Sequence, residues 1–344
     1  MTNQPRVLQV MASGQEGGAE LFFERLAAGL EQAQVEQRLA VKSGTPRNVR
    51  LKGQGLDVVE LPFGGLFDFK TGPALKRVAA DFRPSVILSW MNRATKFCRP
   101  GDYVLAARLG GYYNLKYYRQ CDHLIGNTRG IVDYLRREGW PENKTHYLPN
   151  FVSLPQASPV ARSTLNTPED APLALALGRL HPNKGFDVLL AAMEKLPRFH
   201  LWLAGEGPER QALEAKAQTL GIAQRVHFLG WRPDTAPLLA AADMLVCPSR
   251  HEPLGNVVIE GWASRKPVVA AASAGPAELI RDRETGLLVP VENADELATA
   301  MDKLMEDPSM KSHLAAAGHL AYETEYSEAR VVGLYRKFFE TVKR

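Results

Sequence analysis

Short apolar runs alternate with amphipathic segments along almost the whole chain. Runs such as 85–90 predict buried strands, and segments such as 18–33, with apolar residues three or four positions apart, predict helices. This alternation indicates βαβ units and parallel sheets. In the first half of the chain we expect strands at 6–12, 37–42, 57–61, 85–90, 103–108, 122–126 and 144–148, and helices at 18–33, 71–81 and 129–138.

A second series of the same kind begins at residue 172. Its expected strands are 172–178, 199–204, 225–229, 243–247, 267–271 and 287–290, and its expected helices are 185–196, 208–220, 255–264 and 294–306. The stretch 150–172 between the two series is rich in Pro, Ser and Thr, which is typical of an interdomain linker. The last segment, 327–343, predicts a helix with no strand behind it.

The expected fold class is therefore α/β, with two doubly wound, Rossmann-like domains facing across a cleft. In such sheets, ligands bind beyond the carboxyl ends of the strands, on the loops that enter the helices. The length of 344 residues, with 45% hydrophobic and 23% charged residues, fits two globular domains.

The cysteines and the apolar runs indicate a compartment. Cys98, Cys121 and Cys247 are far apart, so they predict neither a disulfide framework nor a zinc site, and a reducing cytoplasm fits them. No run reaches the roughly 18 apolar residues of a membrane span, and the apolar run in 1–12 is too short for a signal peptide. We expect a cytoplasmic protein that can sit on the inner face of the cytoplasmic membrane.

A glycine-rich loop with Gly17 and Gly18 follows the first strand and enters a helix. Such a loop lets backbone amides approach an anion. The pattern is not G-x-G-x-x-G, and the second strand ends at Lys42 without an acidic residue for a ribose, so a nicotinamide site is disfavoured. A tight turn without a ligand is the alternative interpretation.

Two cations, Arg179 and Lys184, precede the helix that follows the first strand of the second series. The strand ends at Gly178-Arg179, and Lys184 follows five residues after the arginine. Because arginine binds oxygens in pairs and lysine adds a point charge, this arrangement suits a diphosphate. The alternative is a solvated basic loop.

Glu252 and Glu260 are eight positions apart, with a turn and a helix start between them. At about 1.5 Å rise per residue, their carboxylates would lie roughly 12 Å apart or less, a span similar to that from ribose to sugar in a nucleotide-sugar. Each can accept hydrogen bonds from vicinal hydroxyls, while the amides of Leu254, Gly255 and Asn256 would meet the diphosphate. The alternatives are a helix-start carboxylate at Glu252 and a solvent-facing Glu260.

In this order the motifs resemble those of the retaining glycosyltransferases of the GT-B fold, family 4 (glycosyltransferase group 1). The resemblance covers nearly the whole chain and is strongest over 172–291. It is carried by Gly17-Gly18, Pro149-Asn150, Gly178-Arg179, Lys184-Gly185, Gly205-Glu206-Gly207-Pro208, Phe228-Leu229-Gly230, Glu252 with Glu260, and 285–290.

The resemblance implies an acceptor-binding domain of 1–165 plus 325–344, reached by the returning C-terminal helix, and a donor-binding domain of 166–324. Arg179 and Lys184 would neutralise the leaving diphosphate, so neither a metal nor another cofactor is expected. Glu260 would hold the ribose and Glu252 the transferred sugar. Further donor contacts would come from Gly17, Gly18, Gly178, Leu254, Gly255 and Asn256, with the turn of Phe228, Gly230 and Trp231 beside the base.

The implied activity is transfer, with retention, from a nucleotide-sugar (a UDP-sugar) to a glycan or lipid-linked acceptor in cell-surface polysaccharide or lipopolysaccharide synthesis. Members often carry a histidine where this chain has Ser89-Trp90-Met91-Asn92, so no catalytic histidine is assigned. The alternatives are a sugar-nucleotide epimerase or sugar-phosphate synthase on the same fold, and a non-enzymatic sugar-binding protein.

The net charge of +4 conceals two unlike domains. The first carries 27 Lys and Arg against 17 Asp and Glu, a net of +10, and the second carries 15 against 21, a net of −6. A basic first domain predicts docking on anionic lipid or binding of an acidic acceptor; charge that serves solubility alone is the alternative. The segment 112–119 mixes aromatic and basic residues, which predicts a membrane-surface or acceptor-contacting helix, or a half-buried amphipathic one. No signature of a nucleic-acid-binding protein is present.

Overall fold

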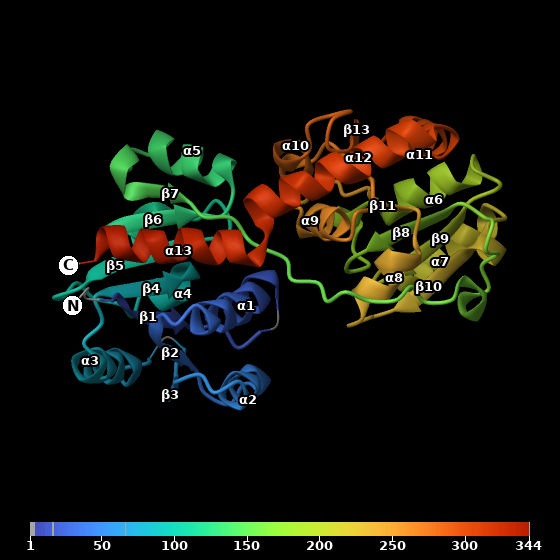
Figure 1. Ribbon diagram of the computed structural model, residues 1–344. Helices are drawn as coiled ribbons and strands as arrows, with labels where there is room; N and C mark the ends of the chain where they lie inside the picture. Colours follow the sequence, from blue (N-terminus) through green and yellow to red (C-terminus); the bar gives the residue numbers. More distant parts are fainter. Residues whose placement is uncertain (1–3, 16, 66, 344) are drawn as a thin grey trace. The chain divides into compact units, whose positions relative to one another are not determined.

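A computed structural model of the protein describes residues 4–15, 17–65 and 67–343. The chain forms two compact units, residues 1–150 with 328–344, and residues 151–327. Each unit is a parallel sheet flanked by helices (Figure 1). The doubly wound α/β fold class expected from the sequence is confirmed.

The sheet of the first unit has seven strands in the order β3-β2-β1-β4-β5-β6-β7, so the order reverses between β1 and β4. All residues of β4 and β5 are buried, because helices cover both faces of the sheet. The strands are β1 (Arg6–Met11), β2 (Glu36–Lys42), β3 (Val58–Leu61), β4 (Val86–Trp90), β5 (Val104–Leu109), β6 (His123–Gly126) and β7 (Thr145–Tyr147).

The C-terminal helix belongs to the first unit. Figure 1 shows α13 (Glu328–Val342) lying along this unit, where it packs against α1 (Gly18–Gln32). The packing is close, because a Cβ added at Gly29 of α1 would stand 2.7 Å from the Val332 side chain. The other helices of the unit are α2 (Pro46–Gly53), α3 (Thr71–Phe82), α4 (Met91–Thr95) and α5 (Arg129–Arg137).

The sheet of the second unit has six parallel strands in the order β10-β9-β8-β11-β12-β13, with the reversal between β8 and β11. The strands are β8 (Leu173–Leu177), β9 (His200–Ala204), β10 (Val226–Gly230), β11 (Met244–Cys247), β12 (Val268–Ala271) and β13 (Leu287–Val289). The helices are α6 (Phe186–Glu194), α7 (Arg210–Thr219), α8 (Thr235–Ala241), α9 (Asn256–Ala263), α10 (Ala274–Leu279), α11 (Ala294–Glu306) and α12 (Pro308–Ala321), followed by a π-helical turn η6 (Tyr322–Tyr326).

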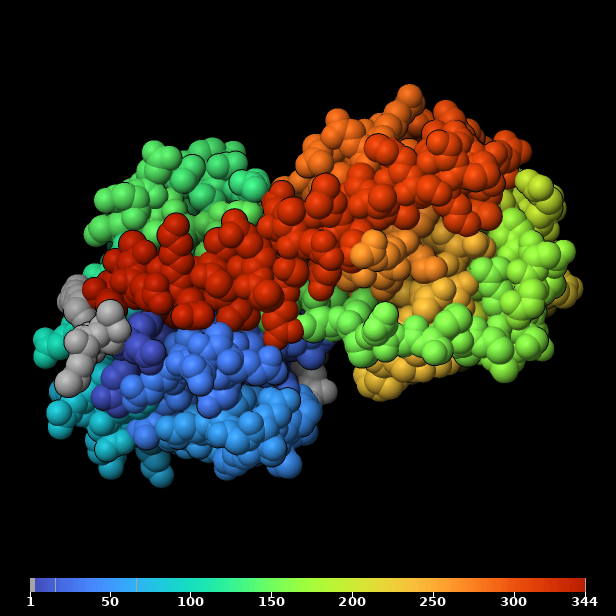
Figure 2. Space-filling view, in the orientation of Figure 1, coloured from blue at the N-terminus to red at the C-terminus, as the bar shows by residue number. Residues whose placement is uncertain are grey.

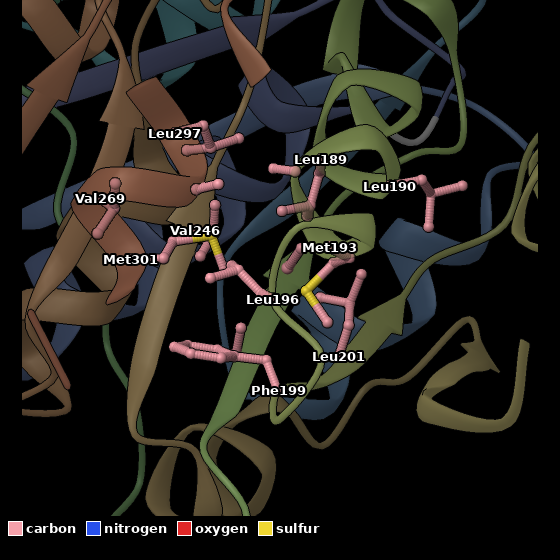
Figure 3. Packing of buried hydrophobic residues seen from close by; sticks show 14 of the residues in the cluster. Leu189, Leu190, Met193, Leu196, Phe199, Leu201, Val246, Val269, Leu297 and Met301 are labelled. Carbon is pink, nitrogen blue, oxygen red and sulfur yellow. The ribbon is translucent and has the colours of Figure 1, made fainter. Parts of the chain in front are cut away.

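A large core fixes one face of this second sheet. Leucine and methionine side chains of α6 and α11 meet valines of β11 and β12, as Figure 3 shows for Leu189, Met193, Val246, Val269 and Met301. Each of these five side chains is at most 1% exposed. The core therefore holds the strands whose carboxyl ends carry the site described below.

The segment expected to be an interdomain linker is bound to the second unit from residue 151 onward. Val152 is fully buried in its core, and the guanidinium of Arg162 donates to the Ala241 carbonyl at 2.7 Å and pairs with Asp243 at 3.1 Å. Trp202 Nε1 donates to Thr167 Oγ1 at 2.9 Å. Figure 2 shows this green to yellow-green segment against the surface of the second unit. The expected boundaries at 165 and 325 therefore move to 150 and 327.

Other departures from the sequence prediction are local. Residues 112–119 form a loop with one 3₁₀ turn, η1 (Leu115–Tyr117), and Tyr118 is fully buried, so no amphipathic helix forms there. The helices α2, α4, α8, α10 and α12 were not expected. Four of them contain a proline in the first turn, a position that a helix accepts because its N–H has no partner there.

Candidate active site

Four loops meet at the carboxyl edge of the second sheet, around the reversal between β8 and β11. The loop after β8 contacts the loop after β9 through the Leu180 N–H and the Glu206 carbonyl, 2.9 Å apart. It contacts the loop after β11 through the His251 N–H and the Asn183 carbonyl, at 3.1 Å, and Gly275 after β12 donates to the Glu252 carbonyl at 2.7 Å. Backbone hydrogen bonds thus hold the loops together.

Glycine is required where these loops touch. Gly185 has φ +64°, and a Cβ there would stand 2.1 Å from the Pro248 carbonyl oxygen. At Gly205, a Cβ would stand 1.8 Å from the Gly178 carbonyl oxygen. The motifs Lys184-Gly185 and Gly205-Glu206-Gly207 thus owe their glycines to packing between loops, whereas Gly178 is favoured by its φ of +146°.

Lys184 and Glu252 form an ion pair across two of these loops. Lys184 ends the 3₁₀ turn η4 (Pro182–Lys184), and its Nζ donates to a carboxylate oxygen of Glu252. The two side chains are 24% and 11% exposed. The other oxygen of Glu252 lies 3.4 Å from the Gly255 N–H, one residue before α9 begins.

Arg179 stands at the end of β8 with an exposed side chain. Among the residues that the structure describes, its guanidinium has neither an ion-pair partner nor a hydrogen bond. One paired and one unpaired cation therefore lie on the same loop, ahead of α6. An anion that bound there would gain a bidentate donor without first breaking a salt bridge at Arg179.

The helix α9 begins at Asn256, one residue later than expected. Gly255, at φ +81°, precedes it, and Leu254 lies in the turn before that. Glu260 is half-buried in the second turn of α9. Glu252 and Glu260 are thus on one continuous loop–helix segment, as the sequence predicted, with the amides of 254–256 between them.

Phe228, Gly230 and Trp231 lie at the end of β10, the edge strand beside β9. The Gly205 N–H donates to the Gly230 carbonyl at 2.7 Å, which ties this turn to the loop after β9. The guanidinium of Arg210 lies 6.0 Å from the centre of the Phe228 ring. Trp231 is 71% exposed, which makes it a surface residue and not part of the core.

Arg250 is a residue that the sequence reasoning missed. Its guanidinium donates to both carboxylate oxygens of Asp187, at 2.6 and 2.7 Å, and to the Pro182 carbonyl at 2.8 Å, and it also pairs with Glu292. These bonds lower the pKa of Asp187. Arg250 therefore positions the turn that carries Lys184. The sequence offered one signal for Arg250, which is its position between Ser249 and His251 in the loop that carries Glu252.

Gly17 and Gly18 belong to the first unit. Gly17 is the residue before α1, in an extended conformation, and Gly18 is the first residue of that helix; both are exposed. Their neighbour Glu16 lies outside the described residues. A Cβ at Gly17 would stand 2.8 Å from a carboxylate oxygen of Glu20, so this loop packs on an acidic side chain.

An open cavity of about 540 Å³ lies at the carboxyl edge of the first sheet, where the strand order reverses between β1 and β4. Burial raises the pKa of the Tyr113 phenol, one of the lining groups, which keeps it a neutral hydroxyl. Met91, at φ +60°, turns the chain sharply at the end of β4. The lining residues are Ser13, Gly14, Gln15, Glu20, Lys42, Trp90, Met91, Asn92, Arg93 and Tyr113.

Metal-binding clusters and membrane-spanning helices are both absent from the described residues. Residues 4–15, 17–65 and 67–343 contain no group of three or more His, Cys, Asp or Glu side chains placed to hold a metal ion. None of the helices in that part of the chain is long and apolar enough to cross a membrane.

The sequence of this chain is similar to known glycosyltransferases. Residues 158–320 match the family described as Glycosyl transferases group 1. The lipopolysaccharide core biosynthesis glycosyltransferase LpsE of Rhizobium meliloti (strain 1021) is 35% identical over 336 residues, which are 94% of this chain and 95% of that protein. LpsD of the same organism is 35% identical over 95% of this chain and 96% of its own length.

Among solved structures, Anabaena Alr3699/HepE in complex with UDP has a TM-score of 0.87, at 20% identity, over 98% of this chain and 100% of that one. The fold of that protein is thus the fold of this one. A match to a glycosyltransferase family and two full-length relatives set aside the epimerase and the non-enzymatic alternatives. The chain belongs to the group 1 glycosyltransferases of the GT-B fold.

Proposed function

We propose that this glycosyltransferase moves a sugar from a UDP-sugar to a saccharide acceptor of the lipopolysaccharide core, with retention of anomeric configuration. The relatives LpsE and LpsD support the acceptor class, and the UDP complex of the Anabaena protein supports the nucleotide. In this proposal the second unit binds the donor and the first unit binds the acceptor.

The observation that carries the proposal is the pair of cations on the loop after β8. Arg179 is exposed and unpaired among the described residues, and Lys184 is held by Glu252 at the start of α6. Negative charge grows on the departing phosphate oxygen as the sugar leaves, so fixed cations there stabilise the transition state more than the ground state.

The other site residues take the roles that their positions allow. Glu260 holds the ribose hydroxyls and Glu252 the transferred sugar, and the amides of 254–256 face the diphosphate with Gly178. Phe228, Gly230 and Trp231 lie beside the base. In the first unit, Gly17 and Gly18 stand at the start of α1, a position that suits an anion.

The reaction balances without a protein nucleophile. The bond between the anomeric carbon and the β-phosphate oxygen breaks, and a bond from that carbon to an acceptor hydroxyl oxygen forms on the same face. The hydroxyl proton passes to the leaving phosphate, and UDP departs. Because Arg179 and Lys184 supply the positive charge, we expect transfer to continue in the presence of EDTA.

Donor binding is tested by the thermal unfolding of the intact protein with UDP, GDP, ADP and their sugars. We expect UDP and a UDP-sugar to raise the unfolding temperature. If none of the nucleotides raises the unfolding temperature, the proposal is refuted.

Substitution of Lys184 by Ala tests the catalytic role. Losing one cation at the leaving group is expected to lower kcat by roughly 10²–10³-fold, as for other groups that stabilise transition-state charge. The matched control is Lys303→Ala, on the exposed side of α11 in the same unit, which should leave kcat unchanged. Near-normal kcat in a folded Lys184→Ala protein would refute this role.

A further inference from the structure

The cavity of the first unit combines groups from three strand ends. Lys42 is the last residue of β2, Trp90 is the last residue of β4, and residues 13–15 follow β1. These strands are adjacent in the sheet, so the three loops open on one side of it. We call this cavity, with the lining residues given above, the β1–β4 pocket.

Two cations line the β1–β4 pocket. The lysine lies across the loop after β1, because a Cβ at Gly14 would stand 3.2 Å from Lys42 Cδ and 3.5 Å from its Nζ. One guanidinium nitrogen of Arg93 donates to the carbonyls of Phe63 and Gly64, at 2.5 and 2.7 Å. These bonds fix the guanidinium in place while its other N–H groups remain available.

Neither cation has a carboxylate partner within the part of the chain that the structure describes. Some other basic residues of the same unit are paired, such as Arg38 with Asp57 and Asp81, and Arg50 with Glu24. A lysine and an arginine that line one pocket without acidic partners form a site for an anion.

The rest of the pocket suits the hydroxyl groups and apolar face of a sugar. Glu20 is 8% exposed and supplies a carboxylate that accepts hydrogen bonds from hydroxyls. The Asn92 oxygen accepts from the Tyr118 hydroxyl, which leaves the amide nitrogen as a donor. The nearly buried Trp90 adds an apolar wall. The pocket therefore pairs hydroxyl-binding groups with an anion site.

We propose that the β1–β4 pocket binds an acceptor saccharide that carries an anionic group, a carboxylate or a phosphate, and that Lys42 and Arg93 recognise this group. The proposal rests on the proposed function, since it defines the acceptor of that transfer. It predicts that a neutral sugar is a poor ligand for this pocket.

The test uses three methyl galactosides that differ at carbon 6 alone: one with a hydroxyl, one with a carboxylate and one with a phosphate. Their binding to the full chain is measured by ligand-observed NMR or calorimetry. We expect at least one anionic sugar to bind about tenfold more tightly than the neutral one, the size of one charge-assisted hydrogen bond. Comparison of the sugar that carries a carboxylate with the sugar that carries a phosphate shows which anionic group the pocket binds.

Substitutions locate the effect. Lys42→Met and Arg93→Gln should each remove the preference for the anionic sugar, while Lys337→Met and Arg77→Gln, exposed cations of the same unit, should retain it. Binding of UDP, measured in parallel, should be unchanged in Lys42→Met.

Two outcomes would overturn the proposal: equal binding of all three galactosides, or a loss of UDP affinity in Lys42→Met as large as the loss of anionic sugar. A loss of UDP affinity would show that Lys42 binds the phosphates of the donor and not an anionic group of the acceptor. Failure of the proposed function differs from both, because the unmodified protein would then bind no nucleotide.

Discussion

At the scale of single residues, the donor-side loops depend on contacts that leave no space for a side chain. Gly185 follows Lys184 directly, and its Cα faces the Pro248 carbonyl of the neighbouring loop. Arg250, two residues after Pro248, bonds back to the Pro182 carbonyl. The backbone position of Lys184 is therefore set by contacts of its loop, while the ion pair with Glu252 holds its side chain.

Gly185→Ala tests this dependence. The new methyl would lie 2.1 Å from a carbonyl oxygen, at a φ of +64° that already disfavours side chains, so the loop must move. We expect a loss of about 1–3 kcal/mol in the free energy of unfolding, typical of local strain, together with weaker UDP binding.

The control for this substitution is Gly221→Ala. Gly221 has nearly the same φ, +66°, but nothing lies within 4 Å of its Cβ position. Gly221→Ala shares the backbone strain without the clash. It should therefore lower the free energy of unfolding less than Gly185→Ala does, and leave UDP binding intact. Equal losses in the two variants, measured by urea unfolding and calorimetry, would show that packing between the loops is unimportant.

At the scale of elements, α13 is held partly by a pair of histidines. His123 on β6 and His146 on β7 share a hydrogen bond of 2.9 Å, and the Phe338 ring of α13 lies 4.8 Å from the His146 ring. Burial, and then the neighbouring His123, lower the pKa of His146 to about 4. Asp122 and Lys144 act on His123 in opposite directions, and burial dominates there, lowering its pKa too.

Acid should therefore loosen α13. Between the unfolded pKa near 6.5 and the folded value near 4, the unfolded chain binds more protons at His146, so the free energy of unfolding falls as pH decreases. We expect a loss on the order of 1–2 kcal/mol from pH 7 to pH 5, with faster hydrogen exchange in α13. His146→Gln should weaken this pH dependence, and the exposed His313→Gln should not.

Unchanged exchange in α13 between pH 7 and pH 5 would contradict this account. Peptide-level exchange is needed because a second histidine pair, His200 and His227 on β9 and β10, has lowered pKa values for the same reason of burial. A global unfolding curve would combine the two pairs.

Much of this element structure could be predicted because buried parallel strands are continuous apolar runs. All thirteen strands and the long amphipathic helices lie within two residues of their expected bounds. The helices α4, α8 and α10 are too short to show a clear helical pattern in the sequence. The linker was misjudged because its Pro-rich composition conceals Val152 and Arg162, whose partners are distant in sequence.

For the site, the sequence placed Lys184 and Glu252 on loops after strands, where the structure also has them, while their roles stay predictions. Contacts between loops were not, because the partners of Arg250 are spread from Pro182 to Glu292. The β1–β4 pocket was also missed. Lys42 and Arg93 lie 51 positions apart, and only the order of strands brings them to one cavity.

At the scale of the whole molecule, charge is divided between the units. With the observed boundaries the first unit has 26 Lys and Arg against 16 Asp and Glu, and the second has 16 against 22. The net charges of +10 and −6 are the same as with the boundaries expected from the sequence. On the first unit, Phe67 and Phe69, before α3, are 81% and 80% exposed.

We expect the protein to co-sediment with vesicles that contain phosphatidylglycerol and not with vesicles of phosphatidylcholine alone, because the basic unit is attracted to anionic lipid. Binding should weaken as salt is raised, since exposed charges are screened within about 10 Å at 0.1 M. Replacing both Phe67 and Phe69 by Ser should reduce the fraction of protein that co-sediments with the anionic vesicles. The control Val49→Ser, at a residue that is 75% exposed, should not reduce it. Equal recovery with both lipids would remove the membrane from the proposal.

The return of α13 to the first unit has a consequence for how the chain is made. The second unit is one continuous stretch, 151–327, so it can fold as soon as that stretch leaves the ribosome. The first unit is not complete until 328–344 appear, although its seven strands are synthesised first. Until then the surface that α13 covers, including Phe22 and His146, is open to solvent. The first unit is therefore synthesised first but completes its folding last. Loss of α13 would destabilise residues 1–150, at the other end of the sequence.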